Sequence, residues 1–198
     1  MSPETAYKPL ILASGSPHRA SLLQRLRIPF EVLAPDIDER PRDNEAPHDL
    51  ATRLAVEKAL RISTDRTAAI VIGSDQVVVH GGQLSGKPGN AEIARRQLSA
   101  FSGNIVQFLT SVALIAEGDT VLGQSVVETR VEFRHLSAEE IDRYLDVDAP
   151  WECAGGFRAE SLGPALFESV FSQDPTAIIG LPLIETARLL RVAGFKVP

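Results

Sequence analysis

A short loop between an apolar run and a helical pattern is the first place in this sequence where chemistry could occur. The stretch LILASGSPHRASLLQRL places Ser14 and Ser16 in a small-residue turn, and Arg19 follows in the first turn of the expected helix. The first N–H groups of a helix have no intrahelical partner, so such a loop can bind an anion. Two hydroxyls and a guanidinium would add donors suited to phosphate oxygens. The residues alone leave open a plain helix N-cap beside a surface arginine.

Asp75 is the carboxylate whose surroundings most require an explanation. It lies between the apolar runs AAIVIG and VVV, where an unpaired charge would be costly to bury. It is therefore a candidate general base or metal ligand, with a cation or several donors beside it. Glu39, in the acidic stretch DIDERPRDNEAP, could supply a second oxygen ligand for magnesium. The alternatives are an exposed aspartate at a strand end and a solvated acidic loop.

Two lysines could neutralise phosphate groups. Lys58 lies four residues after Leu54 and four before Ile62, which places it on the apolar face of an expected helix. Its ammonium could bind a phosphate there or extend past its apolar neighbours to solvent. Lys87 lies in GGQLSGKPGN, but Pro88 stands where an ATP-binding P-loop has the Ser or Thr that binds magnesium. The sequence thus excludes a P-loop and leaves a lysine on a turn.

These residues require a framework of strands and helices to bring them together. Apolar runs predict strands at 9–13, 30–35 and 68–80, a long antiparallel hairpin over 104–136, and a strand-like run that begins at 178. Helices are expected to begin near Pro17, Pro47, Asn90 and Ser137, and a last helix is expected to end at Gly194. Alternating strands and helices followed by a hairpin favour a mixed α/β sheet over a purely parallel one, in one domain over 1–198.

Composition limits the classes of protein that this chain can belong to. With 198 residues and 44% hydrophobic residues, it can bury one sizeable core. The single cysteine, Cys153, excludes an intramolecular disulfide and agrees with a reducing compartment. Without a signal-peptide pattern or an apolar run long enough to span a bilayer, we expect a soluble, cytoplasmic protein with no membrane partner. A net charge of −6 argues against binding long nucleic acid, although a few local cations could hold a small anion.

Taken together, the motifs resemble those of the Maf family of nucleotide pyrophosphatases. They run in the family's order through nearly the whole chain: LILASGSPHRASLLQRL, DIDE, RLAVEKA, IGSDQVV, GKP, SGNIVQFLTSVAL, CAGGFRAESLG and IIGLPL. The resemblance implies an elongated, twisted mixed α/β sheet with flanking helices and two lobes around a central cleft, as in inosine triphosphatase-like proteins, and commonly a homodimer. It implies hydrolysis of a nucleoside triphosphate between its α and β phosphorus atoms, with release of pyrophosphate.

The resemblance also implies a role for each candidate residue. By position, phosphate would be bound by Ser14, Arg19, Lys58 and Lys87, while Asp75 would be catalytic and would share a divalent metal ion, magnesium or manganese, with Glu39. Such a set suits attack on phosphorus, which is catalysed mainly by positioning and by stabilising charge on the oxygens. Whether Asp75 takes a proton directly or through a metal-bound water stays open at this point.

Three further positions separate two branches of the family, one acting on dTTP and UTP and the other on 7-methyl-GTP. Gln76 and Glu160, in SDQ and GGFRAE, resemble the second branch. Glu160 could accept hydrogen bonds from the Watson–Crick edge of a guanine, and its charge complements a cationic 7-methylated ring. Gln76 could bind the base or orient its neighbour. His18 departs from the pattern, because the 7-methyl-GTP branch usually has a larger aromatic residue there.

We therefore expect a 7-methyl-GTP pyrophosphatase with a house-cleaning role in the nucleotide pool. The alternatives are a dTTP and UTP pyrophosphatase of the same family, a generic phosphatase that releases orthophosphate, and a non-catalytic nucleotide sensor that regulates cell division.

Overall fold

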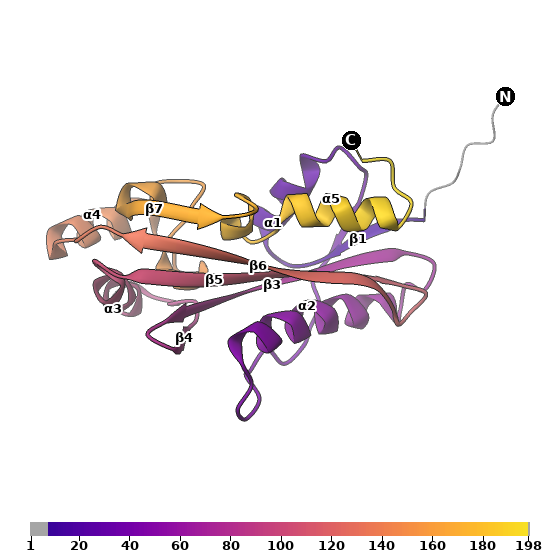
Figure 1. The fold of residues 1–198 in the computed structure, drawn as a ribbon, viewed down its shortest axis with the longest axis horizontal. Coiled ribbons are helices and arrows are strands. Elements are labelled where there is room, and N and C mark those ends of the chain that lie inside the picture. The colour runs from indigo at the N-terminus through magenta and orange to yellow at the C-terminus, as the bar shows by residue number, and fades with distance from the viewer. Residues whose placement is uncertain (1–7, 198) are drawn as a thin grey trace.

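A single mixed sheet lies at the centre of the molecule in the computed structural model, which describes residues 8–197 (Figure 1). Its strands are β1 (Leu10–Ala13), β2 (Glu31–Leu33), β3 (Ile70–His80), β4 (Gln83–Ser85), β5 (Ile105–Ala116), β6 (Thr120–Phe133) and β7 (Phe167–Ser172). They lie in the order β2-β1-β3-β5-β6-β7, with β4 paired to β3. The β1–β2 and β1–β3 pairs are parallel and the others antiparallel, so the mixed sheet expected from the sequence is confirmed.

Helices cover both faces of this sheet. They are α1 (Pro17–Gln24), α2 (Pro47–Ser63), α3 (Ala91–Phe101), α4 (Ala138–Asp148) and α5 (Leu183–Val192), with short 3₁₀ turns η1 (Ala154–Gly156), η2 (Gly163–Leu166) and η3 (Ala177–Ile179). In Figure 1, α2 lies below the sheet, and α1 and α5 lie above it. No helix in the described part of the chain combines the length and apolar character needed to cross a membrane.

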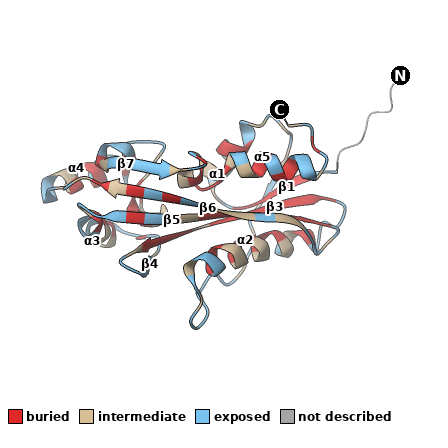
Figure 2. Cartoon of the chain, viewed as in Figure 1, coloured by how far each residue is buried: buried red, intermediate tan, exposed pale blue. Residues whose placement is uncertain are grey.

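Alternation of side chains along the strands explains why both faces are covered. Successive residues of a strand point to opposite faces. Leu10 and Leu12 of β1 pack in a cluster with residues of α1 and α5, whereas Ile11 and Ala13 pack in a second cluster with Ala59 of α2. Every residue of β1 is therefore buried, and the buried residues follow the central strands in Figure 2.

The apolar core divides between two lobes that share the sheet. One lobe contains the cluster around β1, α1 and α5 together with the cluster under α2. The other contains a separate cluster of α3, α4 and the distal parts of β5 and β6, in which the rings of Phe108, Phe133, Phe157 and Phe167 lie 5.0–5.8 Å apart at steep angles. Such edge-to-face contacts are a favoured aromatic geometry. The single domain predicted over 1–198 includes residues 1–7 and 198, which lie outside the described residues.

The chain between β7 and α5 differs from the strand expected at 178. Ala177–Ile179 form the turn η3 instead of pairing with another strand, because polar groups fix this segment locally. Asp174, which is 1% exposed, accepts hydrogen bonds from the backbone N–H groups of Thr176, Ile184 and Glu185. The sequence prediction also missed β7, whose FESVFS pattern is short and largely exposed because it lies at the sheet edge.

Gly73 allows α2 to approach the sheet closely. It lies in the middle of β3, and a Cβ atom there would collide with the backbone of α2 at the Ala55 carbonyl and at the Ala59 nitrogen, 2.8 Å away. Displacing the backbone of a helix costs more free energy than displacing the end of a flexible side chain. Glycine at this position therefore sets the distance between β3 and α2.

We predict that Gly73→Ala lowers the free energy of unfolding by about 1–3 kcal/mol, because an added methyl group overpacks this contact. Denaturation in urea measures the change. Gly86→Ala is the matched control, since a Cβ atom at Gly86 meets nothing within 4 Å. Equal stabilities of the two variants would contradict this account of Gly73.

Candidate active site

A cavity of about 910 Å³ brings together every residue that the sequence assigned to a site. It is lined by Ser14, His18, Arg19, Glu39, Lys58, Asp75, Gln76, Lys87 and Glu160, among others. These residues come from segments far apart in the chain and from both lobes. The volume is in the range of small-molecule sites and large enough for a nucleotide.

The centre of the cavity is a buried ion pair between α2 and β3. Lys58 Nζ donates to Asp75 Oδ1 at 2.6 Å and lies 2.9 Å from Glu39 Oε1. Lys58 and Asp75 are 6% and 5% exposed, so neither could carry its charge there alone without a large desolvation cost. The structure thus excludes an exposed Asp75 at a strand end and a Lys58 that extends to solvent, because both side chains are buried and Lys58 points between two carboxylates.

Alternation along β3 explains this pairing. Gly73 and Val77 contact α2 and its cluster, so Asp75, halfway between them, points to the same face and meets Lys58. Ser74 and Gln76 point to the opposite face, where η3 lies. A single strand thus presents a catalytic candidate on one side and supporting polar groups on the other.

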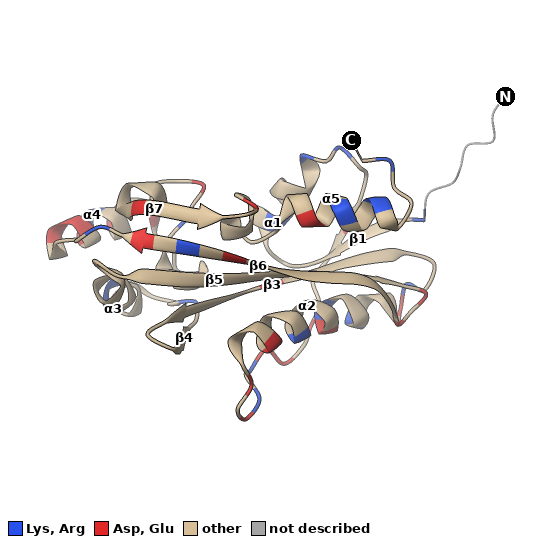
Figure 3. Cartoon of the chain, in the orientation of Figure 1, with Lys and Arg blue, Asp and Glu red and all other residues tan. Residues whose placement is uncertain are grey.

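The loop that carries Glu39 is fastened to α2 by Arg53. This guanidinium donates to both carboxylate oxygens of Glu45, at 2.6 and 2.8 Å, and to the Arg40 carbonyl oxygen at 3.1 Å. Hydrogen bonds from Arg53 and from the backbone of Arg42 lower the pKa of Glu45 to about 2. Figure 3 shows charges of both signs on α2 and on the loop that extends from it. Since α2 also carries Lys58, the same helix positions both partners of the Glu39–Lys58 contact.

The loop before α1 combines a helix cap with donors at the cavity. The Ser16 hydroxyl caps α1 by accepting from the Arg19 backbone N–H at 3.4 Å, and Ser14 Oγ accepts from the Ser16 N–H at 3.1 Å. The Arg19 side chain turns inward, donating from Nε to the Gly180 carbonyl at 2.7 Å and from Nη1 to Ser14 Oγ at 3.4 Å. Burial lowers the pKa of Arg19, and the negative charges of Asp75 and Glu39 oppose this shift. Arg19 is therefore a cavity residue as well as a neighbour of the cap.

Gln76 fastens η3 to the sheet. Its Nε2 atom lies 3.0 Å from the Ala177 carbonyl oxygen, 3.1 Å from that of Ile178 and 3.1 Å from Thr110 Oγ1. Three acceptors occupy the two hydrogens of this amide, so its nitrogen is engaged within the protein. Of the two roles that the sequence left open for Gln76, this geometry favours orienting its neighbours over reading the base.

His18 and Glu160 meet across the cavity. His18 Nδ1 lies 2.8 Å from Glu160 Oε1, and the two side chains are 35% and 28% exposed. One residue belongs to α1 and the other to the loop between η1 and η2, so the contact joins the two lobes. Lys87, by contrast, is 63% exposed, and Glu152 Oε2 lies 3.9 Å from its Nζ. The structure thus pairs two of the predicted specificity residues and leaves the predicted phosphate-binding Lys87 largely accessible.

Sequence reasoning missed several residues that line the cavity, of which Cys153, Phe157 and Arg158 lie in one loop. The signal was available in CAGGFRAESLG, where a basic residue follows the glycines.

Comparison with known proteins gives matches over almost the whole chain. The model of a family described as Maf-like protein matches residues 9–193. A 7-methyl-GTP pyrophosphatase from Albidiferax ferrireducens is 45% identical over 194 residues, covering 98% of each chain. Another from Xanthomonas axonopodis pv. citri is 48% identical over 189 residues, covering 96% of this chain and 98% of that one.

One match among solved structures is much weaker. A HAM1 protein from Coxiella burnetii aligns with 80% of this chain and 90% of its own at 16% identity, with a TM-score of 0.44. A likeness of that size carries no argument about function.

We predict that Lys58→Met lowers the free energy of unfolding by about 3–5 kcal/mol at neutral pH, because it leaves Asp75 buried without its cation. The double variant Lys58→Met with Asp75→Asn should recover much of this loss, since it removes the uncompensated charge. Chemical denaturation of the two single variants and the double variant measures the coupling. A double variant no more stable than Lys58→Met would show that the pair contributes no such coupling.

Proposed function

Because the chain belongs to the Maf family, we propose that it hydrolyses nucleoside triphosphates between the α and β phosphorus atoms and that its substrate is 7-methyl-GTP. The products are 7-methyl-GMP and pyrophosphate. The observation that carries the proposal is the buried Lys58–Asp75 pair, which opens onto a cavity that also contains Arg19 and Glu160. Relatives that match nearly the full length of this chain at 45% and 48% identity are named 7-methyl-GTP pyrophosphatase, which supports it.

In the proposed reaction Asp75 is the proton acceptor. A water oxygen attacks the α phosphorus, the bond to the bridging oxygen breaks, and the electron pair leaves with pyrophosphate while the water gives a proton to Asp75. Lys58 occupies Oδ1, so Oδ2 is the oxygen available for the proton. A positioned base of this kind contributes about 10²–10⁴-fold in rate. Ser14 and Arg19 supply donors for the phosphate oxygens, where negative charge increases.

A divalent metal ion, magnesium or manganese, is part of the proposal, and the residues present fit it. Lys58 engages one oxygen of each carboxylate, Glu39 at 2.9 Å and Asp75 at 2.6 Å, so the two groups lie close together and each keeps a second oxygen as a hard ligand. Among the described residues, no group of three or more His, Cys, Asp or Glu side chains could hold a metal ion. Magnesium is often bound by one or two carboxylates and completed by substrate phosphates and water. Such an ion would neutralise charge on the phosphate oxygens.

The pair formed by Glu160 and His18 supports a purine substrate with a positive charge. His18 engages Oε1 of Glu160, which leaves Oε2 to accept from the Watson–Crick edge of guanine. The carboxylate also complements the cationic 7-methylated ring. His18, which stands where the 7-methyl-GTP branch usually has a larger aromatic residue, therefore positions Glu160, the carboxylate proposed to bind the base.

The remaining expectations from the sequence stay predictions. These are a homodimer, a cytoplasmic location, a house-cleaning role in the nucleotide pool, and the absence of long nucleic acid and membrane partners. The dTTP and UTP specificity and the regulatory role stay as alternatives, which the two experiments below separate from the proposal.

We predict that Asp75→Asn reduces release of pyrophosphate from 7-methyl-GTP by about 10²–10⁴-fold, because an amide cannot accept the proton. The assay contains magnesium and resolves pyrophosphate from orthophosphate. Asp119→Asn, in the exposed turn between β5 and β6, is the matched control and should retain full activity. Orthophosphate as the product would indicate a generic phosphatase, and nucleotide binding without turnover by the parent protein would indicate a sensor.

We predict that Glu160→Gln combined with Gln76→Thr shifts preference from 7-methyl-GTP towards dTTP and UTP, with a change in the ratio of kcat/KM of about tenfold or more. The loss of the carboxylate removes its attraction for the cationic base. Each single variant is measured as well, because Gln76→Thr also breaks the contacts to η3. Glu168→Gln, on the exposed edge strand β7, is the control. An unchanged preference in Glu160→Gln and in the double variant would contradict the branch assignment.

A further inference from the structure

Arg158 is a cation at the cavity without an anionic partner. Its Nε atom is shielded from solvent and has no hydrogen-bond partner, and its guanidinium forms no ion pair with a carboxylate of the described residues. By contrast, Lys58 contacts two carboxylates, and Arg19 donates to a carbonyl and a hydroxyl. Arg158 is half-buried and donates to the Cys153 thiol, which is a weak acceptor, so its shielded Nε–H has no partner unless a ligand supplies one.

The backbone holds Arg158 at this position. Its N–H donates to the buried hydroxyl of Tyr144 on α4 at 2.9 Å, and its carbonyl accepts from the Gly163 N–H at 2.9 Å. Gly163 permits this turn, because a Cβ atom there would collide with the Arg158 carbonyl group. One turn after Tyr144 on α4, Asp148 accepts from the Ser161 hydroxyl at 2.7 Å. Helix α4 therefore fixes the loop on both sides of Glu160, and Arg158 enters the cavity from a rigid support.

The surroundings of Cys153 place Arg158 on the same side of the cavity as Lys87. Burial raises the pKa of the Cys153 thiol, a hydrogen bond from Arg158 and the positive charge of Lys87 oppose the shift, and Glu160 adds to it. The thiol thus contacts Arg158, and Lys87 lies on the same side because Glu152, which precedes Cys153 in the chain, is its nearest carboxylate. Lys87 has an exposed carboxylate 3.9 Å away, which is a weak partner in water.

The charges of the cavity fall into two groups. Around the Lys58–Asp75 pair, the cations are balanced by Asp75 and Glu39, so that group has little positive charge to spare. On the side of η1, Arg158 and Lys87 are the cations that remain available. The proposed reaction leaves an additional negative charge on the departing pyrophosphate, and stabilising it requires such unpaired donors.

We infer that Arg158, together with Lys87, binds the β and γ phosphate groups and holds them as they leave as pyrophosphate. This inference rests on the proposed function and adds to it a binding residue that stabilises the leaving group. Arg158 suits the role better than a lysine would, because its planar fork can contact two phosphate oxygens at once.

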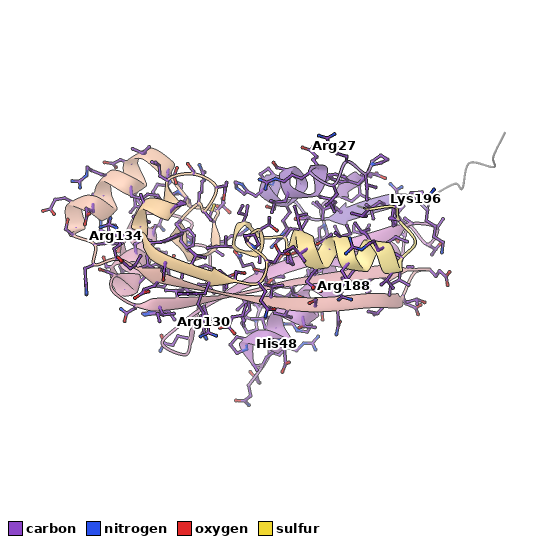
Figure 4. All side chains as sticks on the ribbon, turned by 45° about the horizontal axis from the view of Figure 1, so that its top comes forward. Arg27, His48, Arg130, Arg134, Arg188 and Lys196 are labelled. Carbon is purple, nitrogen blue, oxygen red and sulfur yellow. The ribbon has the colours of Figure 1, made fainter. Side chains whose placement is uncertain are left out.

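Titration calorimetry with inorganic pyrophosphate tests the inference directly, with magnesium in every sample. Arg158→Met should bind pyrophosphate about tenfold or more weakly than the parent protein, whereas affinity for 7-methyl-GMP should change little. Arg158→Lys should fall between the two. The matched control is Arg130→Met, on strand β6 and labelled in Figure 4, because Arg130 is 62% exposed and lies outside the cavity. Thermal unfolding of each variant shows whether the fold is retained.

The lone cysteine provides a second measurement. Pyrophosphate bound at Arg158 should slow alkylation of Cys153 in the parent protein and in Arg130→Met, and should have little effect in Arg158→Met. Equal affinity of Arg158→Met and the parent for pyrophosphate would overturn the inference. So would an equal loss of affinity for pyrophosphate and 7-methyl-GMP, which would indicate a general disturbance of the site. These two binding results do not test the reaction itself: if the parent protein still releases pyrophosphate from 7-methyl-GTP, the proposed function stands and only the role assigned to Arg158 is wrong.

Discussion

The cost of burying one carboxylate, that of Asp75, determines how a strand, a helix and a loop of this protein are arranged. Asp75 lies in the middle of the central strand β3, where an ionised group is stable only with a cation at hydrogen-bond distance. Lys58 meets that requirement from α2, and it can do so only because Gly73 lets the helix approach the strand. The position of α2 then determines where the loop with Glu39 lies. One electrostatic constraint thus connects the sheet, a helix and a loop.

The opposite face of β3 is fixed by neutral hydrogen bonds. Gln76 donates to carbonyl groups of η3, and Ser74 donates to the carbonyl of Gly180 just after it, which also accepts from Arg19. Asp75 therefore lies between two layers that cannot shift independently, and Arg19 is positioned by the same turn. As the proposed general base, Asp75 is held from both sides and would need little reorganisation when charge develops on a bound phosphate group.

Much of this could be predicted from the sequence, and the limits have physical causes. The helix starts at Pro17 and Pro47 and the paired state of Asp75 follow from local rules, namely backbone preference and the cost of burying charge. The turn at 177–179 could not be predicted, because its apolar residues read as a strand and the hydrogen bonds of Asp174 that define it are contacts visible only in three dimensions. The pairing of His18 with Glu160 joins residues 142 positions apart, which no spacing rule encodes.

The sheet that both lobes share has a consequence for the width of the cleft. Strands β3, β5 and β6 pass from one lobe to the other without a linker, and the β3–β5 and β5–β6 ladders pair residues along nearly their whole lengths. Adjacent strands in a sheet are rotated relative to one another, so the spacing between the walls of the cavity depends on the accumulated twist. The width of the cleft is therefore set by strands that are continuous through both lobes.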